Sequence, residues 1–408
     1  GDSLRCRRRI PWASGAPRGA PRADDVFERR SDAHCHSGGS GAQDSCRARL
    51  GRGVTRVAVV GAGITGLAAA WELAQEGAEP VVLESEPRAG GVIVTERRDG
   101  FVVEGGPDGF LAAEPELPAL ARELGIGDGL VDQLARGSFL WTGARLEPLE
   151  EGRAAALLGI SEPVHEDLSK GFRSFAGGMA DIVDALVVRL GSRVATASGV
   201  AGVARSGRGY RLVLTGGAAV EVEGCVCAVP AWVAAHLLTS LGVPPARDLD
   251  DVLYFPSLTV SLAYRREQVR ARLEGTGFVA RLEEGGTLRA CTYASLKYPN
   301  RAPEEFLLLR AFLAPVAGDP AATAHAELAK ILAISGVPLW TSAFHWLRGL
   351  PRYQPQHAAH VAAIRDRLAR LPPLAIAGAG VDRAGVSACV RSGRTAARAV
   401  LERLGAVQ

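Results

Sequence analysis

The stretch that decides the fold is Arg56–Gly77, RVAVVGAGITGLAAAWELAQEG. Its short, valine-rich apolar run predicts a buried strand, and a helix follows directly. Between them, Gly61, Gly63 and Gly66 have the G-x-G-x-x-G spacing. The first glycine permits a tight turn, the second lets a pyrophosphate approach the backbone, and the third lets the helix pack on the strand. Because the amides at the start of the helix favour phosphate, the stretch predicts a dinucleotide-binding unit.

The residues after this unit indicate which dinucleotide binds. A second strand, PVVLE, ends in Glu84, ~20 residues past the glycines, where an acid hydrogen-bonds a ribose hydroxyl. A nicotinamide dehydrogenase would then continue into another helix. This chain instead reads SEPRAGGVIVTERRDGFVVEGGPDGFL. It has a glycine doublet at Gly90 and Gly91, a hairpin pattern around Asp99-Gly100, and a second glycine-rich turn.

The end of the chain repeats the strand, glycine and helix pattern in 374–401, LAIAGAGVDRAGVSACVRSGRTAARAVL. A second, independent nucleotide site would need a further βαβ unit. Only seven residues follow Leu401, so there is no room for one. The stretch is therefore predicted to supply the last strand and the closing helix of the first domain.

Composition limits the class of protein. With 408 residues, the chain is predicted to form two domains. A hydrophobic content of 47% and a mean hydropathy near zero are typical of soluble globular proteins. A net charge of +3 is too small to indicate nucleic-acid binding, and no apolar run approaches the ~18 residues that span a bilayer. The dispersed cysteines favour a reducing compartment, and Cys225 and Cys227 are predicted to pack on one face of a strand.

The first 53 residues are rich in Arg, Gly, Pro and Ser and lack a hydrophobic period. They are predicted to be disordered. A transit peptide would be poor in acids, whereas this segment contains several. A wrongly assigned start codon would explain the segment equally well.

From Val54 to its end the chain resembles the oxygen-dependent, FAD-containing protoporphyrinogen oxidase family of the flavin amine oxidase superfamily. The motifs that carry the resemblance are EGGPDGFL, SFAGGMADIVDALVVRLG, CTYASLKYPNRAPEEFLLLRAFLAP, FHWLRGLPRYQPQH and the closing stretch. The resemblance implies an α/β fold, in which a discontinuous, FAD-binding Rossmann-like domain accompanies a mixed or antiparallel substrate-domain sheet. It assigns 54–110, 171–235 and 341–408 to the FAD-binding domain, 236–340 to the substrate sheet, and 111–170 to the remnant of a helical substrate and membrane domain.

The same resemblance implies which residues bind FAD. They come from all three segments assigned to the FAD-binding domain. They are Gly61, Ala62, Gly63, Ile64, Thr65, Gly66, Glu84, Ser85, Arg88, Gly90, Gly91, Val92, Gly106, Pro107, Asp108, Gly109, Val200, Trp346, Ala384, Gly385 and Val386. No catalytic residue is assigned, because the flavin carries the difficult step.

Two features depart from the family. Between GSFLWTGARLEPLE and KGFRSFAGGM this chain has only residues 151–169, where relatives carry a long helical insert that walls the substrate cavity and contacts the membrane. Arg383 also stands where the family usually has glycine, before the closing helix. Arg383 could add bulk and charge beside the flavin ring, or it could point outward from a loop.

The implied reaction is the six-electron oxidation of a porphyrinogen to a porphyrin, with hydride transfer to the flavin and O2 as the final acceptor. The substrate could be protoporphyrinogen IX or coproporphyrinogen III. Two alternatives stay open: another flavin amine oxidase, acting on an amine or a carotenoid, and a non-catalytic FAD-binding remnant. The family also implies a cytoplasmic location with at most peripheral contact with the inner membrane, and a homodimer is a further expectation.

The histidines suggest no metal site. His357 and His360 have i, i+3 spacing, but no third ligand accompanies them, so a solvated helix face is the preferred interpretation. His345, next to Trp346, is expected to pack near the flavin.

Overall fold

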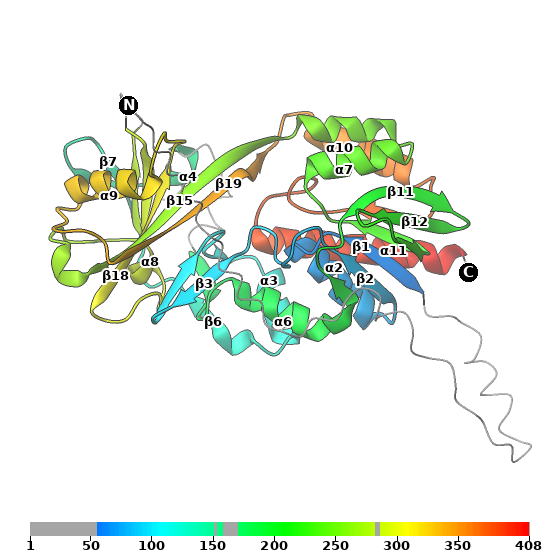
Figure 1. Ribbon diagram of the computed structural model, residues 1–408, viewed down its shortest axis with the longest axis horizontal. Coiled ribbons are helices and arrows are strands. Elements are labelled where there is room, and N and C mark those ends of the chain that lie inside the picture. Colours follow the sequence, from blue (N-terminus) through cyan, green and yellow to red (C-terminus); the bar gives the residue numbers. More distant parts are fainter. Residues whose placement is uncertain (1–54, 151–152, 158–169, 282–285, 408) are drawn as a thin grey trace, which may run out of the picture. The chain divides into compact units, whose positions relative to one another are not determined.

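The computed structural model of the protein describes residues 55–150, 153–157, 170–281 and 286–407 (Figure 1). The chain divides into two units, Gly1–Gly51 and Arg52–Gln408. All of the described residues belong to the second unit. The prediction for residues 1–53 therefore lies outside the described residues.

A parallel sheet of five strands forms the centre of the nucleotide-binding part. Its order is β10-β2-β1-β14-β20, and all four pairings are parallel. The strands are β1 (Arg56–Val60), β2 (Glu79–Leu83), β10 (Val194–Ala195), β14 (Gly224–Cys227) and β20 (Leu374–Ile376). Segments from both ends of the chain thus share one sheet, as the sequence predicted.

Both faces of this sheet are covered, which explains the nearly continuous apolar runs of its strands. On one face, Val57 and Val59 pack against helices that include α2 (Ile64–Gln75), α6 (Ala180–Leu190) and α11 (Val386–Val407). On the other face, Ala58 and Val60 pack against the antiparallel sheet β11-β12-β13 and two more helices. These elements are β11 (Val200–Ser206), β12 (Gly209–Leu214), β13 (Ala219–Val222), α7 (Ala231–Ser240) and α10 (His357–Leu368).

Cys225 and Cys227 of β14 both lie in this second core cluster as free, buried thiols. Burial raises the pKa of both thiols, to about 12 for Cys227. The prediction that they are core residues on one face of a strand is confirmed.

A second, seven-stranded sheet has the order β19-β15-β18-β17-β16-β7-β8. Its strands are β7 (Ser138–Trp141), β8 (Leu146–Leu149), β15 (Leu253–Arg265), β16 (Gly277–Ala280), β17 (Leu288–Tyr293), β18 (Phe306–Leu313) and β19 (Trp340–Arg352). All neighbours are antiparallel except β16 and β7, so the sheet is mixed. Helix α9 (Pro320–Ile331) packs on one face through Ala324 and Leu328.

The membership of this sheet differs from the sequence-based domain assignment at two places. Strand β19 was assigned to the FAD-binding part, but it runs beside β15 along most of its length (Figure 1). Strands β7 and β8 were assigned to a helical remnant. They form an edge of the sheet instead, because Phe139 and Trp141 pack against the apolar core under α9.

Smaller elements connect the two sheets. Asp99 and Gly100, with positive φ angles of 49° and 80°, form the predicted two-residue turn between β3 (Thr95–Arg98) and β4 (Phe101–Glu104). A three-stranded sheet has the order β5-β9-β6. The remaining elements are β5 (Phe110–Leu111), α3 (Glu116–Glu123), β6 (Leu130–Asp132), α4 (Arg153–Leu157), β9 (Phe172–Phe175) and α8 (Ala294–Lys297). Among the described helices, none combines the length and apolarity needed to span a bilayer.

Candidate flavin site

The three fingerprint glycines have different structural roles. Gly61 has a φ of +98°, and a Cβ there would lie 2.6 Å from the carbonyl oxygen of Ala228. A Cβ on Gly66 would lie 1.9 Å from the carbonyl oxygen of Gly61. The fold itself therefore requires glycine at both positions.

Gly63 is different, because a Cβ there would have no atom of the described residues within 4 Å, and its φ of −66° suits any residue. Gly63 is the N-cap of α2, and no side chain caps this helix end. The first amides of a helix have no intrahelical partner, and the start of α2 at Gly63 is also the positive end of the helix dipole. This arrangement fits the pyrophosphate of a dinucleotide.

Glu84 is fixed beside the turn at the end of β2. Its Oε2 accepts a hydrogen bond of 2.7 Å from the amide of Ala62, and its Oε1 accepts one of 2.9 Å from the amide of Glu86. The residue is only 8% exposed. The hydroxyl of Ser85 also donates to Oε1 at 3.2 Å. A carboxylate offers about four acceptor positions, so about one position remains for a further hydroxyl donor. The geometry suits the ribose role that the sequence predicted, which stays a prediction.

The two residues before Val200, Ser198 and Gly199, pack against Glu84 and Ser85. The amide of Ser198 donates a 2.6 Å hydrogen bond to the carbonyl of Glu84. A Cβ on Gly199 would lie 3.2 Å from the Cβ of Ser85. The structure therefore brings the predicted residues Glu84, Ser85 and Val200 together.

The glycine doublet lies on the fingerprint turn. Gly90 forms a parallel bridge with Gly63 and donates a 2.8 Å hydrogen bond to the carbonyl of Ala62. The Arg88 guanidinium holds the doublet loop by donating to the carbonyls of Ala89, Gly91 and Ile93. Burial lowers the pKa of Arg88, while Glu84 and Glu86 act in the opposite direction. Arg88 therefore acts here as a clamp on the loop.

The second glycine turn, 105–109, packs on this loop. The amide of Gly105 donates to the carbonyl of Val94 at 2.8 Å. A Cβ on Gly106 would lie 1.8 Å from the carbonyl oxygen of Val92, and one on Gly109 would lie 2.1 Å from Oη of Tyr298. Pro107 and Asp108, between these glycines, are partly buried. Residues 61–109 thus bring three glycine-rich segments together.

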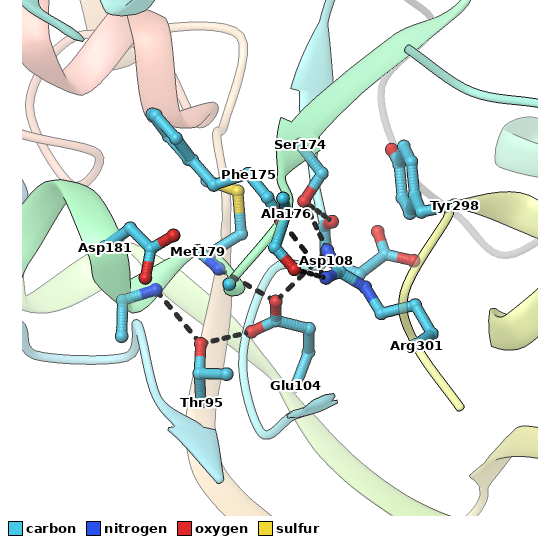
Figure 2. A network of polar contacts seen from close by, with 12 residues as sticks. Thr95, Glu104, Asp108, Ser174, Phe175, Ala176, Met179, Asp181, Tyr298 and Arg301 are labelled. Atoms are coloured by element: carbon cyan, nitrogen blue, oxygen red, sulfur yellow. Dashed lines mark hydrogen bonds and ion pairs between the residues drawn. The ribbon is translucent and has the colours of Figure 1, made fainter. Parts of the chain in front are cut away.

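A buried network of polar side chains supports this turn (Figure 2). Arg301, 2% exposed, donates from Nη1 to the carbonyls of Phe175 and Ala176 and from Nη2 to Oγ of Ser174 at 2.7 Å. It also lies 3.5 Å from Oε1 of Glu104. Burial raises the pKa of Glu104, and Arg301 opposes this effect.

Three more side chains reach the turn from the seven-stranded sheet and α8. Lys297 Nζ lies 2.9 Å from Oδ2 of Asp108. Arg310 Nη2 donates to the carbonyl of Gly106 at 2.7 Å, and Trp346 Nε1 donates to the carbonyl of Gly105 at 2.7 Å. Burial would raise the pKa of Asp108, but Lys297, Arg310 and Arg301 hold it below its ordinary value. Of these residues, only Trp346 and Asp108 were predicted site residues.

The closing segment completes the site. A Cβ on Gly378 would lie 3.5 Å from Oγ1 of Thr65, and one on Gly393 would lie 2.1 Å from the carbonyl oxygen of Thr65. Helix α11 therefore packs directly on the first turn of α2, where Ile64 and Thr65 are buried. Ala384, Gly385 and Val386 lie at its start, and the buried hydroxyl of Ser387 has no hydrogen-bond partner in the described part of the chain.

Arg383 adopts the outward position. Its side chain is 50% exposed, and Nη2 lies 3.7 Å from Oε1 of Glu114. This ion pair links the turn before α11 to the segment before α3, and it supports the interpretation of Arg383 as a loop residue.

The histidine predictions were wrong in two cases. His357 is buried rather than solvated, because it packs against Tyr353 and its Nε2 hydrogen-bonds the carbonyl of Val381 at 2.9 Å. His345 is exposed, since it alternates along β19 with Phe344 and Trp346, which face the glycine turn. The described residues contain no group of side chains suited to a metal ion.

Comparison with known proteins agrees with this arrangement. The model of the family "Flavin containing amine oxidoreductase" matches residues 64–159 and 132–401. The coproporphyrinogen III oxidase of Bacillus subtilis is 24% identical, over 84% of this chain and 97% of that protein. The chloroplastic protoporphyrinogen oxidase of Nicotiana tabacum is 25% identical, over 62% of this chain and 66% of that protein.

Two solved structures share the fold. A protein from Exiguobacterium sp. 255-15, provisionally assigned as a protoporphyrinogen oxidase, superposes with a TM-score of 0.74 at 23% identity, covering 86% of this chain and 100% of that chain. The cyclohexylamine oxidase of Brevibacterium oxydans IH-35A superposes with a TM-score of 0.68 at 14% identity, with the same coverage of both chains.

The alignment with the Bacillus subtilis relative also contains many positions that this chain does not fill. It spans 460 positions but includes 84% of this chain. Since 84% of 408 residues is about 343, about 117 aligned positions carry no residue of this chain.

Proposed function

The chain belongs to the flavin-containing amine oxidoreductase family and is a flavin-dependent oxidoreductase, and on that basis we propose that it binds FAD and oxidises a porphyrinogen. The observation that carries the cofactor proposal is Gly63. The described residues leave the Cβ position of Gly63 free, so their packing does not require glycine there. A bound pyrophosphate close to the backbone would require it. Neighbouring Glu84 supplies a fixed carboxylate for a ribose.

The flavin, when bound, would accept electrons from the substrate carbon atoms and pass them to O2. The chain's own residues position it. The amides at the start of α2 would receive the pyrophosphate, Glu84 would receive the ribose, and the doublet loop held by Arg88 would close over the phosphates. The turn at 105–109, fixed by Arg310 and Trp346, would lie against the ring system.

The proposed substrate is coproporphyrinogen III or protoporphyrinogen IX, with O2 as acceptor. Several relatives similar over more than four-fifths of this chain are coproporphyrinogen III oxidases, from Bacillus subtilis and Staphylococcus aureus among others. This supports coproporphyrinogen III as the first substrate to test. Each porphyrinogen loses six electrons and six protons when it becomes a porphyrin. Each O2 accepts two electrons and two protons and becomes H2O2, so one porphyrinogen consumes three O2.

The decisive experiment gives each porphyrinogen separately to the FAD-loaded protein in air. Porphyrin fluorescence and H2O2 are measured together, with heat-inactivated protein as the control for spontaneous oxidation. We expect protein-dependent porphyrin formation with coproporphyrinogen III. If neither substrate is oxidised faster than in the control, the proposed activity is refuted.

A flavoprotein that has lost turnover is the second candidate. The family model matches this chain in two overlapping parts, and about 117 positions of the alignment with one relative are empty here. Both findings support the loss of the predicted helical insert between Glu150 and Lys170. A yellow protein with an oxidised-flavin spectrum but no porphyrinogen turnover would identify this case.

The domain roles are part of the same proposal. We assign FAD binding to the five-stranded parallel sheet with its helices, and substrate binding to the face of the seven-stranded sheet that meets the 105–109 turn. A cytoplasmic location with peripheral contact with the inner membrane, and a homodimer, remain proposals.

A further inference from the structure

We propose that Arg348 is a carboxylate-binding residue for the substrate, so that the site favours a tetrapyrrole with many acidic side chains. This inference rests on the proposed porphyrinogen activity. Coproporphyrinogen carries propionate groups where protoporphyrinogen carries vinyl groups, so a cation at the site would favour the former.

Arg348 follows two residues of β19 that contact the candidate site. A Cβ on Gly105 would lie 2.5 Å from the Phe344 ring, and Trp346 donates to the Gly105 carbonyl. The register of β19 against β15 shifts directly after Trp346, so the contacts of Arg348, rather than strand alternation, define its position.

A contact with α7 places Arg348 near the closing turn of the candidate site. Its guanidinium carbon lies 4.4 Å from the ring centroid of Trp232, at the start of α7. Trp232 in turn packs edge-on against Tyr254, with centroids 4.7 Å apart and an interplanar angle of 84°. Tyr254 lies against the closing turn, since a Cβ on Gly380 would be 2.6 Å from its Oη.

The aromatic pair is anchored to backbone. The hydroxyl of Tyr254 accepts a 3.1 Å hydrogen bond from the amide of Ala231, the residue before Trp232. The stacking surface for Arg348 is therefore positioned before any ligand arrives. A pre-positioned guanidinium loses less entropy on binding than a freely moving one.

Arg348 has no carboxylate partner within the described ranges, although it is exposed. Other arginines near the closing turn do have one: Arg365 pairs with Asp382 and Arg383 pairs with Glu114. The cation–π contact with Trp232 occupies none of the hydrogen-bond donors of the guanidinium. Its edge keeps the N–H donors that bind a carboxylate through two parallel hydrogen bonds.

Strand β19 also provides a matched control. Arg352 is exposed and stacks on an aromatic ring, with its guanidinium carbon 5.3 Å from the ring centroid of Phe255. It pairs in register with Leu253, whereas Pro351 pairs with Tyr254. Arg352 therefore lies on the ribbon face opposite to Tyr254 and Trp232.

The test measures binding of air-stable coproporphyrin III to the FAD-loaded protein by fluorescence titration. The variants are Arg348→Gln, Arg348→Lys and Arg352→Gln, and the second probe is coproporphyrin III tetramethyl ester. We expect Arg348→Gln to weaken coproporphyrin III binding by about tenfold or more, as for a hydrogen bond to a charged group. Arg348→Lys should retain part of the affinity, and Arg352→Gln should behave as the unaltered protein.

The ester separates charge recognition from packing. It should bind equally to the unaltered protein and to Arg348→Gln, because it offers no carboxylate. Equal loss of acid and ester binding in Arg348→Gln would show that Arg348 only supports packing, and would overturn the inference. Unchanged binding of coproporphyrin III to Arg348→Gln would also overturn the inference, but it would leave the proposed porphyrinogen activity intact.

If Arg348→Gln does not fold, the unaltered protein still provides a test. The unaltered protein should bind coproporphyrin III more tightly than the tetramethyl ester. This difference in affinity should shrink at high salt, both in the unaltered protein and in Arg348→Lys. Equal binding of acid and ester would overturn the inference. Failure of the unaltered protein to bind either porphyrin would instead refute the proposed function, and this inference with it.

Discussion

The guanidinium of Arg310 donates a 2.7 Å hydrogen bond from Nη2 to the carbonyl of Gly106. Arg310 lies on β18, about 200 residues from that glycine in the sequence, and is 5% exposed. Burial lowers its pKa, and Asp108 and Glu104 oppose this effect. One buried cation thus joins the seven-stranded sheet to the turn that would lie against the flavin.

We predict that Arg310→Met lowers the free energy of unfolding by about 1–3 kcal/mol, because the Gly106 carbonyl loses its charged donor and one of the cations that oppose the burial of Asp108 is removed. Flavin retention should fall as well, since the Gly106 carbonyl loses its donor. Urea unfolding and the flavin-to-protein absorbance ratio measure the two effects. Arg352→Met, on an exposed ribbon face, is the control. Unchanged stability of Arg310→Met would show that the network is not a determinant of the fold.

Two fingerprint glycines separate folding from cofactor binding. Gly63→Val should leave the apoprotein folded, because no atom of the described residues lies within 4 Å of the new Cβ, yet it should abolish flavin retention. Gly66→Ala should destabilise the apoprotein itself, since its Cβ would meet the Gly61 carbonyl oxygen at 1.9 Å. Thermal unfolding of both apoproteins and their flavin content measure this contrast. Stoichiometric FAD in purified Gly63→Val would contradict the assignment of the site.

Replacing Glu84 by Ala should weaken FAD binding by ~1–3 kcal/mol, the cost of leaving a buried polar group unpaired. The amides of Ala62 and Glu86 also lose their acceptor, so a smaller loss of stability should accompany it. Titration of the apoprotein with FAD measures the affinity. Glu86→Ala removes a neighbouring exposed acid and serves as control. Equal affinity in the parent and in Glu84→Ala would exclude Glu84 as the ribose ligand.

The pair Lys297–Asp108 should make stability depend on pH in the acid range. The folded-state pKa of Asp108 lies below its ordinary 3.8, since the effect of burial is outweighed by Lys297 and two arginines. A depressed carboxyl pKa stabilises the fold above the unfolded-state pKa, and this contribution is lost as the pH falls through the folded-state pKa.

Lys297→Met should therefore destabilise the protein at pH 7 by about 1–3 kcal/mol, as for a hydrogen bond between charged groups. The difference from the parent should shrink as the pH falls below about 4, because Asp108 becomes protonated in both proteins. Urea midpoints measured across the acid range give the two curves. A difference that is independent of pH would mean that Lys297 acts by packing on Phe172 and Tyr298 rather than through Asp108.

The sequence predicted the parts of the site that depend on local spacing. Gly61, Gly66 and the Asp99-Gly100 turn follow from backbone conformations that neighbouring residues require. Glu84 follows from its distance along the chain from the glycines. In the structure, Gly61, Gly66 and Glu84 lie at the turn after β1, and Asp99-Gly100 forms the hairpin turn.

Residues that act across long separations were missed. Arg301 and Arg310 contact the 104–109 segment from about 200 residues away, and no local period reveals such a contact. The available signal was an arginine within the apolar run FLLLRAFL, since a charge in a buried strand needs a partner. His345 was misplaced because strand alternation, rather than its neighbour Trp346, decides which face it occupies.

We propose that this chain lacks the helical insert of the family. Ligand sites for large apolar molecules bury most of the ligand surface, and about 117 positions of the alignment with the Bacillus subtilis relative carry no residue of this chain. Exposed apolar side chains lie on the β15–β19 ribbon, including Leu253 and Leu347, which is 73% exposed. Because such surfaces promote association, we expect flavin binding with weak porphyrinogen turnover, and dimers or larger species at high concentration. Sedimentation and steady-state assays with both porphyrinogens measure these properties.

Grafting the helical insert of a full-length relative between Glu150 and Lys170 should raise turnover and reduce association, whereas a linker of equal length made of glycine and serine should do neither. A native chain that already turns over as fast as the full-length relative would show that the substrate is adequately enclosed without the insert.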